Sequence, residues 1–165
     1  RVYDWVRFAD AKATVAGSIT AVLIGLTSNL VIQWWIIVTK VDNIRENAYL
    51  IILPGFFLVL LAYLLLRTLW HILRAIKARV NDSSQNLLFF GYISSMSAQD
   101  FQGKIEAATL EKLRQDQIRQ LHANSIIAHS KFKSINSAVE SLAAAIVLLL
   151  LASIAIFIAK QFLIS

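Results

Sequence analysis

The chain has 165 residues, of which 58% are apolar or aromatic and only 16% carry a charge, and its mean hydropathy is +0.63. Soluble domains carry about 25% charged residues, so this composition excludes a disordered chain and is untypical of a water-soluble domain. Cysteine is absent, which excludes disulfides, cysteine-ligated metal sites and a thiol nucleophile. The net charge is +6, and in a membrane protein the placement of the surplus Lys and Arg indicates orientation.

The first charge-free stretch lies between Lys12 and Lys40. It is longer than the roughly 20 residues that a helix needs to cross the hydrocarbon, so we predict a transmembrane helix over 13–39. Several Ser, Thr, Asn and Gln residues indicate that this span packs against other helices, and Trp34 and Trp35 are typical of interfacial anchors. Two aspartates upstream and the lack of a short apolar core before a cleavage site are untypical of a signal peptide.

Two further charge-free stretches, at 47–66 and 141–159, are also long enough to cross a bilayer. We therefore predict transmembrane helices over 47–66 and 138–159. Pro54 and Gly55 interrupt the second span, and the missing backbone donor of proline predicts a kink that neighbouring helices compensate.

Small residues recur in two of the spans, as the row Ala13, Gly17 and Ala21 and as the patch 143–145. Such residues let helices approach closely. The rows fit packing within one chain or contact between subunits. Three spans cannot enclose a pore, so a pore would require a homo-oligomer.

Loop charges predict the orientation. The segment 67–137 holds ten Lys and Arg against five acids, whereas the short loop between the first two spans carries two of each. The positive-inside rule then places the first residues and the segment 67–137 in the cytoplasm. The predicted divisions are a cytoplasmic juxtamembrane segment 1–12, spans 13–39 and 47–66 joined by an outside loop 40–46, a cytoplasmic helical region 67–137, a third span 138–159 and an outside tail 160–165.

The cytoplasmic segment 67–137 also has helical patterns. Residues 67–80 continue the second span as an amphipathic helix, and the polar residues 81–85 end it. Ser97 and Asp100 have the spacing of a capping box, which predicts the start of another helix. No proline follows before the third span, so we predict one helix of roughly fifty residues or more. The predicted fold class is all-α: an integral membrane protein with three transmembrane helices and a helical cytoplasmic region.

A row of polar side chains follows one broad face of this long helix, namely Asp116, Gln120, Asn124 and Lys131. Spacing alone favours a solvated helix face. Asp10 and Lys12 form a second polar pair just before the first span, where Lys12 can extend to the headgroups as an interfacial anchor.

Four short segments occur in a fixed order around the three spans: DAKA at 10–13, LLFFGYIS at 87–94, DQIRQL at 116–121 and NSIIAHSKFKSI at 124–135. This pattern resembles the PycTM-type Pycsar effector proteins and covers nearly the whole chain. Members of that family are bacterial antiphage effectors. The resemblance implies an inner-membrane protein that responds to a cyclic pyrimidine mononucleotide, cCMP or cUMP, made by a partner cyclase. It then impairs the inner membrane, which causes abortive infection.

The resemblance also implies site residues, because the family pattern matches particular positions of this chain: Asp10, Lys12, Phe89, Phe90, Asp116, Gln120, Ser125, Lys131 and Phe132. The chain has no recognisable separate cyclic-nucleotide-binding domain. The ligand would therefore bind the helical cytoplasmic part itself.

A cyclic nucleotide presents one anionic phosphate and a flat base. The phosphate requires a cation, and the base requires amides or aromatic faces. These requirements give roles to six residues: Lys12 and Lys131 for the phosphate, Gln120 and Asn124 for the pyrimidine edge, and Phe90 or Phe132 for stacking. The alternative is a structural ion pair between Lys131 and Asp10 or Asp116.

The sequence gives little support for catalysis. The HExxH, GxSxG, GxGxxG and P-loop patterns are absent, so we expect no enzyme. His122 and His129 lack a third ligand, and we expect neither a metal nor a cofactor. Basic residues near the span ends fit anionic lipid better than nucleic acid. Two alternatives remain: a non-enzymatic membrane anchor or sensor, and a constitutive oligomeric channel subunit, although the absence of charge within the spans disfavours ion transport.

Overall fold

The chain folds into three long helices and two short ones in a computed structural model that describes residues 2–41, 48–77 and 87–164. Of residues 2, 3, 90 and 164 only the backbone is described. The helices are α1 (Val2–Lys40), α2 (Ala48–Ile76), α3 (Phe90–Ile93), α4 (Ala98–Glu106) and α5 (Leu110–Ile164). No strand occurs in these ranges. The predicted all-α fold class is confirmed.

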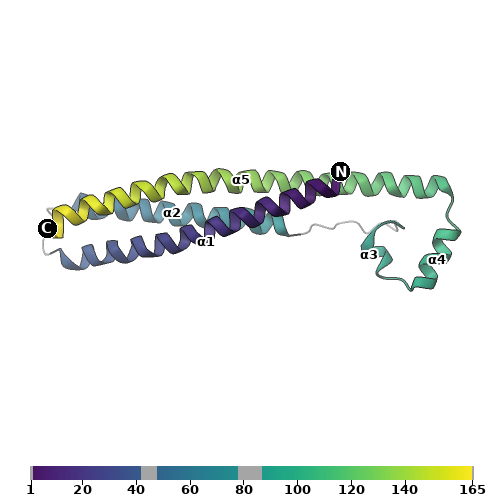
Figure 1. Ribbon diagram of the computed structural model, residues 1–165, viewed down its shortest axis with the longest axis horizontal. Helices are drawn as coiled ribbons and strands as arrows, with labels where there is room; N and C mark the ends of the chain where they lie inside the picture. The colour runs from purple at the N-terminus through teal and green to yellow at the C-terminus, as the bar shows by residue number, and fades with distance from the viewer. Residues whose placement is uncertain (1, 42–47, 78–86, 165) are drawn as a thin grey trace.

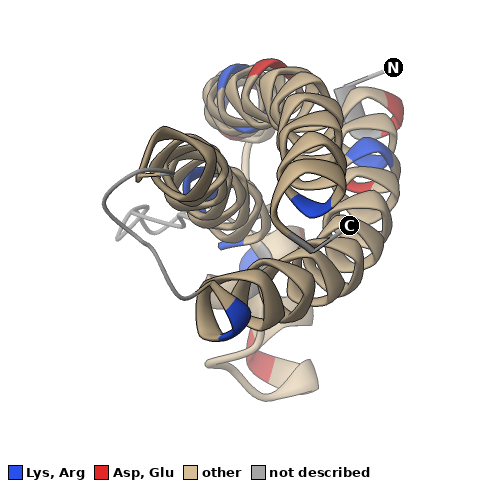
Figure 2. Cartoon of the chain, turned by 90° about the vertical axis from the view of Figure 1, so that its left-hand side faces the viewer, with Lys and Arg blue, Asp and Glu red and all other residues tan. Residues whose placement is uncertain are grey.

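The long helices α1, α2 and α5 form an elongated bundle (Figure 1). Helices α1 and α5 run in one direction and α2 runs in the other, and the N-terminus lies alongside the middle of α5. Each pair of long helices is in contact. Helices α3 and α4 lie beyond the end of the bundle, next to the start of α5. Seen end-on, the bundle is mostly tan, because charged residues are few along it (Figure 2).

The three long helices are each long and apolar enough to cross a membrane. The qualifying stretches are Asp4–Lys40, Ala48–Ile76 and Leu110–Leu163. The chain is therefore a membrane protein with three spanning helices, as predicted. Helix α5, with 55 residues, is much longer than the roughly 20 that a span requires, so it extends well outside the bilayer.

Helix α5 packs into the bundle through a row of alanines spaced seven residues apart. Ala138, Ala145, Ala152 and Ala159 are each at most 1% exposed. A seven-residue interval keeps side chains on one face of a slightly supercoiled helix, and small side chains let backbones come close in lipid. The larger Leu142 and Ile156 fill the space beside this row.

On α1 the buried small residues are Ala9, Ala13 and Ala16. This spacing differs from the expected row of Ala13, Gly17 and Ala21. Ala21 is exposed, and a Cβ added to Gly17 would meet nothing within 4 Å. The contact face of a helix with neighbours on one side alternates between three- and four-residue steps, so a strict four-residue row moves off that face.

Pro54 and Gly55 lie inside α2, which continues through both. Trp34 of α1 covers this point: a Cβ added to Gly55 would lie 3.0 Å from Trp34 Cζ2, and Trp34 Nε1 donates to the Ile51 carbonyl at 3.0 Å. Trp34 thus joins α1 to α2, whereas Trp35 is 61% exposed. Proline removes a donor from the helix at this level, and glycine leaves room for the indole.

The helix predicted to begin after Ser97 does begin there. Ser97 Oγ accepts from the Asp100 amide at 3.1 Å and donates to Asp100 Oδ2 at 2.7 Å. This confirms Ser97 as the N-cap of the predicted capping box, with the Asp100 carboxylate bonded to the Ser97 hydroxyl. The helix does not continue into the third span without interruption, however. It ends at Glu106, and α5 starts after Thr109, whose Oγ1 accepts from the Lys112 amide at 3.3 Å. A threonine cap satisfies the first free donors of the new helix.

Some predicted features lie outside the described residues, namely most of the loop 40–46, the last part of the amphipathic helix 67–80 and the polar break 81–85. The described part of that amphipathic helix continues α2 to Ile76, as predicted.

Candidate functional site

The site residues predicted from the sequence fall into two groups. Asp116 and Lys131 both lie on α5, but fifteen residues separate them, which is about 22 Å along the helix axis. Lys131 lies beside the N-terminal part of α1. Asp116 lies beside the segment that starts at Leu87. The structure therefore does not bring all of these residues into one cluster.

The first group is built around an ion pair between two helices. Lys131 Nζ lies 2.6 Å from Asp10 Oδ1, joining α5 to α1. The Lys131 side chain is 13% exposed, whereas that of Asp10 is 51% exposed. Beneath the pair, Ala9, Ala13 and Ile135 form a small apolar cluster. A largely buried lysine side chain is thus paired with a carboxylate that is half exposed to solvent.

Aromatic rings surround this ion pair. Phe132, which follows Lys131, contacts Trp5 edge-on with ring centroids 5.8 Å apart, and it contacts Phe8 at 6.2 Å. Lys12 Nζ lies 4.7 Å from the centroid of the Phe8 ring, a cation–π arrangement. Trp5 was not among the site residues predicted from the sequence. It lies three residues before Phe8, and Phe8 lies four residues before Lys12, so the helical spacing places all three on one face and could have identified Trp5.

A pocket of about 380 Å³ opens at this place, lined by Trp5, Ser125, Ala128 and Phe132. Its volume falls in the range of small-molecule sites, roughly 300–1,000 Å³. The Ser125 hydroxyl donates to the Leu121 carbonyl at 2.8 Å, so its oxygen can still accept.

Two amides extend the polar row above this pocket. Asn124 is half-buried. The Gln120 side chain is also half-buried, and within the described ranges its buried Oε1 has no hydrogen-bond partner. A buried acceptor of this kind is costly unless a donor reaches it.

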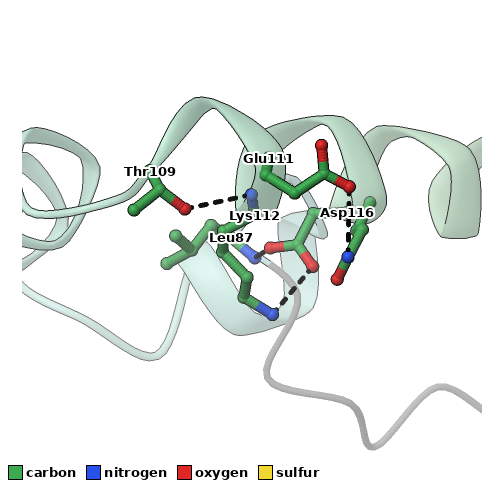
Figure 3. A network of polar contacts seen from close by, with 6 residues as sticks. Leu87, Thr109, Glu111, Lys112 and Asp116 are labelled. Carbon is green, nitrogen blue, oxygen red and sulfur yellow. Dashed lines mark hydrogen bonds and ion pairs between the residues drawn. The ribbon is translucent and has the colours of Figure 1, made fainter.

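The second group surrounds Asp116, which is fully buried. Its Oδ2 accepts from the Leu87 amide at 3.2 Å, and its Oδ1 pairs with Lys112 Nζ at 3.1 Å (Figure 3). Glu111, five residues earlier, accepts from Gln115 Nε2 at 3.3 Å on the helix surface. Asp116 therefore attaches the chain at Leu87 to α5, which is a structural task.

A second pocket of about 410 Å³ lies beside this attachment, lined by Leu87, Tyr92, Lys104, Ala107, Ala108 and Lys112. Lys104 Nζ donates to the Tyr92 hydroxyl at 2.9 Å. Phe89 is half-buried and does not line either pocket: its ring lies against its own turn, where a Cβ at Gly91 would be 2.6 Å from Phe89 Cε1. The side chain of Phe90 is outside the described part.

The structure thus brings together Asp10, Lys131 and Phe132, with Lys12 and Ser125 nearby. Phe89 and Asp116 belong to the second group. Over the ranges that the structure covers, no group of three His, Asp or Glu side chains could hold a metal ion.

Comparison with known proteins gives one match. The family model described as the Pycsar effector protein domain matches residues 1–159. No curated protein and no solved structure matches the chain.

Proposed function

Because the chain belongs to the Pycsar effector protein family, we propose that it is an antiphage effector gated by a cyclic pyrimidine mononucleotide, cCMP or cUMP. A partner cyclase supplies the nucleotide. Binding at the cytoplasmic end of the bundle rearranges the helices of an oligomer, which impairs the inner membrane and causes abortive infection. Family membership and three spanning helices support the membrane effector. The aromatic pocket next to the Asp10–Lys131 pair carries the ligand assignment.

The pocket, together with polar side chains of α1 and α5 that do not line it, offers what each part of the nucleotide needs. Trp5 and Phe132 present aromatic faces for the flat base. Lys131 immediately precedes Phe132 and supplies a cation for the phosphate, with Lys12 as the second. The unpartnered Gln120 Oε1 is an acceptor suited to an exocyclic amine or ring N–H, and Asn124 adds a second amide.

The ligand gates the protein by competing with Asp10. In the free protein Lys131 is held by the Asp10 carboxylate; in the bound protein the phosphate takes that place. Asp10 and the N-terminal part of α1 are then released from α5. A ligand shifts such an equilibrium only by its differential affinity for the two states, and a lysine that serves either anion provides that difference.

Binding of labelled cCMP and cUMP to Lys131→Ala tests the site. We expect affinity to fall at least about tenfold, as for a lost charge-assisted hydrogen bond. Lys133→Ala is the matched control, because Lys133 is exposed two residues further along. Unchanged nucleotide binding with a lower melting temperature would show that Lys131 serves only the ion pair. A loss of binding in Lys104→Ala instead would move the site to the second pocket.

Growth and membrane potential after expression, with and without added cCMP or cUMP, test the effector role. We expect toxicity and depolarisation only with one of the nucleotides. Depolarisation without nucleotide would indicate a constitutive channel subunit. No effect under any condition would indicate a membrane anchor or sensor.

A further inference from the structure

The outward face of α1 carries polar side chains among apolar ones such as Val15, Val22 and Ile36, whereas the outward faces of α2 and α5 are largely apolar. Ser18, Gly25, Asn29 and Gln33 are exposed and fall within an arc of about 80° on the helix. This arc is opposite the buried Thr20, Leu23 and Thr27. The outward face of α2 carries Ile52, Phe56 and Val59, and that of α5 carries Val147, Leu150 and Ile154.

Asn29 lies near the middle of the membrane-spanning bundle. Leu23 belongs to the apolar cluster that includes Leu61 and Ala145, and Ile37 belongs to the cluster that includes Leu58 and Ala152. Asn29 lies between these two levels, near the middle of the charge-free stretch 13–39. The bilayer surface is about 15 Å away, so an Asn side chain cannot reach water there.

Hydroxyl groups on the spans satisfy their donors locally. Ser18, Thr20, Thr27 and Ser28 each donate to a carbonyl four residues earlier. The side-chain amides of Asn29 and Gln33, in contrast, keep donors and an acceptor without partners in the described part of the chain. Gln33 Nε2 donates to Asn29 Oδ1 at 2.9 Å, and within the described ranges neither side chain has a further partner. An amide has two N–H donors and a carbonyl acceptor, so Asn29 retains both donors and Gln33 retains its acceptor.

We infer that this face of α1 binds the same face of a second copy of the chain. Lipid offers no hydrogen bonds at this depth, whereas a second Asn29–Gln33 pair offers the missing acceptor and donors, so the surface is self-complementary. Gly25, one turn earlier, lets the two backbones approach. The resulting oligomer has α1 at its centre and the apolar faces of α2 and α5 towards lipid. The inference is independent of nucleotide binding.

Disulfide cross-linking in native membranes tests the interface, because the chain contains no cysteine of its own. Gly25→Cys places a thiol on the polar face, where an added Cβ has open space. Val59→Cys is the matched control: Val59 is 72% exposed on α2 at a similar depth. We expect oxidant to link two copies through Gly25→Cys and not through Val59→Cys. Equal linkage at both positions, linkage at neither, or linkage to a different protein overturns the inference.

The amides themselves are tested by adding Asn29→Leu and Gln33→Leu to the Gly25→Cys chain. Both changes replace lipid-facing polar groups by apolar ones and leave the intrachain core intact, so the fold is retained and circular dichroism verifies it. We expect the association constant to fall about tenfold, the effect of losing interhelical hydrogen bonds. Tyr63→Leu, on the exposed side of α2, is the control. Undiminished cross-linking in the double Leu chain refutes the role of the amides.

Discussion

The half of α5 that packs in the bundle and the half nearer its N-terminus place different residues at the same seven-residue interval. In the bundle the row is Ala138, Ala145, Ala152 and Ala159, all buried. Seven and fourteen residues before Ala138, the same row holds Lys131 and Asn124. The same face of one helix is therefore closely packed in one half and carries polar side chains, of which Lys131 pairs with Asp10, in the other.

The alanine half of α5 is therefore expected to determine the stability of the bundle, and the polar half to determine switching. An alanine that packs against a neighbouring helix backbone has no other partner that fits it equally well, because closely packed interiors admit few arrangements. An ion pair with an exposed carboxylate can exchange its anion at modest cost, about 1 kcal/mol or less. Substitutions in the two halves should therefore differ in which property they change.

The largest effect is expected from Ala145→Leu. Ala145 is fully buried in the bundle, so added methylene groups force the helices apart at a cost of roughly 1–3 kcal/mol. Thermal unfolding in detergent should show this destabilisation. Ala144→Leu is the control, since Ala144 is exposed and a larger side chain there meets lipid. Equal stability of the two variants would contradict the assignment of the packed face.

Asp116→Ala should have an effect of similar size at the site itself but confined to one attachment. It leaves the Leu87 amide without its acceptor, a loss of roughly 1–3 kcal/mol for a buried donor. We expect faster amide hydrogen exchange over 87–109 with the spans unchanged. Glu111→Ala removes a nearby exposed carboxylate and should leave exchange unaltered. A uniform loss of protection along the whole chain would indicate that Asp116 supports the bundle and not just this attachment.

The smallest change in stability is expected from Asp10→Asn, because the Asp10 side chain is 51% exposed and the Asn oxygen can still accept from Lys131. Its functional effect should be a gain: freed from its competitor, Lys131 should bind cCMP or cUMP a few-fold more tightly in a binding titration. Glu140→Gln, at an exposed carboxylate on α5, is the control and should change neither stability nor nucleotide binding. Weaker nucleotide binding in Asp10→Asn would indicate that Asp10 positions Lys131 for the ligand.

The sequence predicted the three spans and the capping box, because both depend on local composition and spacing. Charge-free length identifies a span whatever its neighbours, and the contacts of Ser97 with Asp100 are confined to one helical turn. The length of α5 was also predictable, because no proline interrupts it.

Features that depend on contacts between helices were not predictable in this way. The break before α5 was missed for another reason: the cap at Thr109 is local, but threonine also occurs inside helices and does not by itself mark a helix start. Trp5 enters the pocket only because α1 crosses α5 at Phe132. Asp116 and Lys131 share a face in the helical pattern, yet that pattern carries no information on which neighbour each one meets.

Helix α5 is one continuous helix about 80 Å long at 1.5 Å per residue, and roughly 50–60 Å of it separate the pocket residues from its C-terminal end. Because the helix is continuous, under the proposed function a tilt set by the ligand at the pocket also appears in the bilayer. Coupling free energies are reciprocal. Bilayer thickness, which sets the preferred tilt of a spanning helix, would then enter the nucleotide's binding constant, and a membrane thinned or stretched during infection would itself act as a second input to the effector.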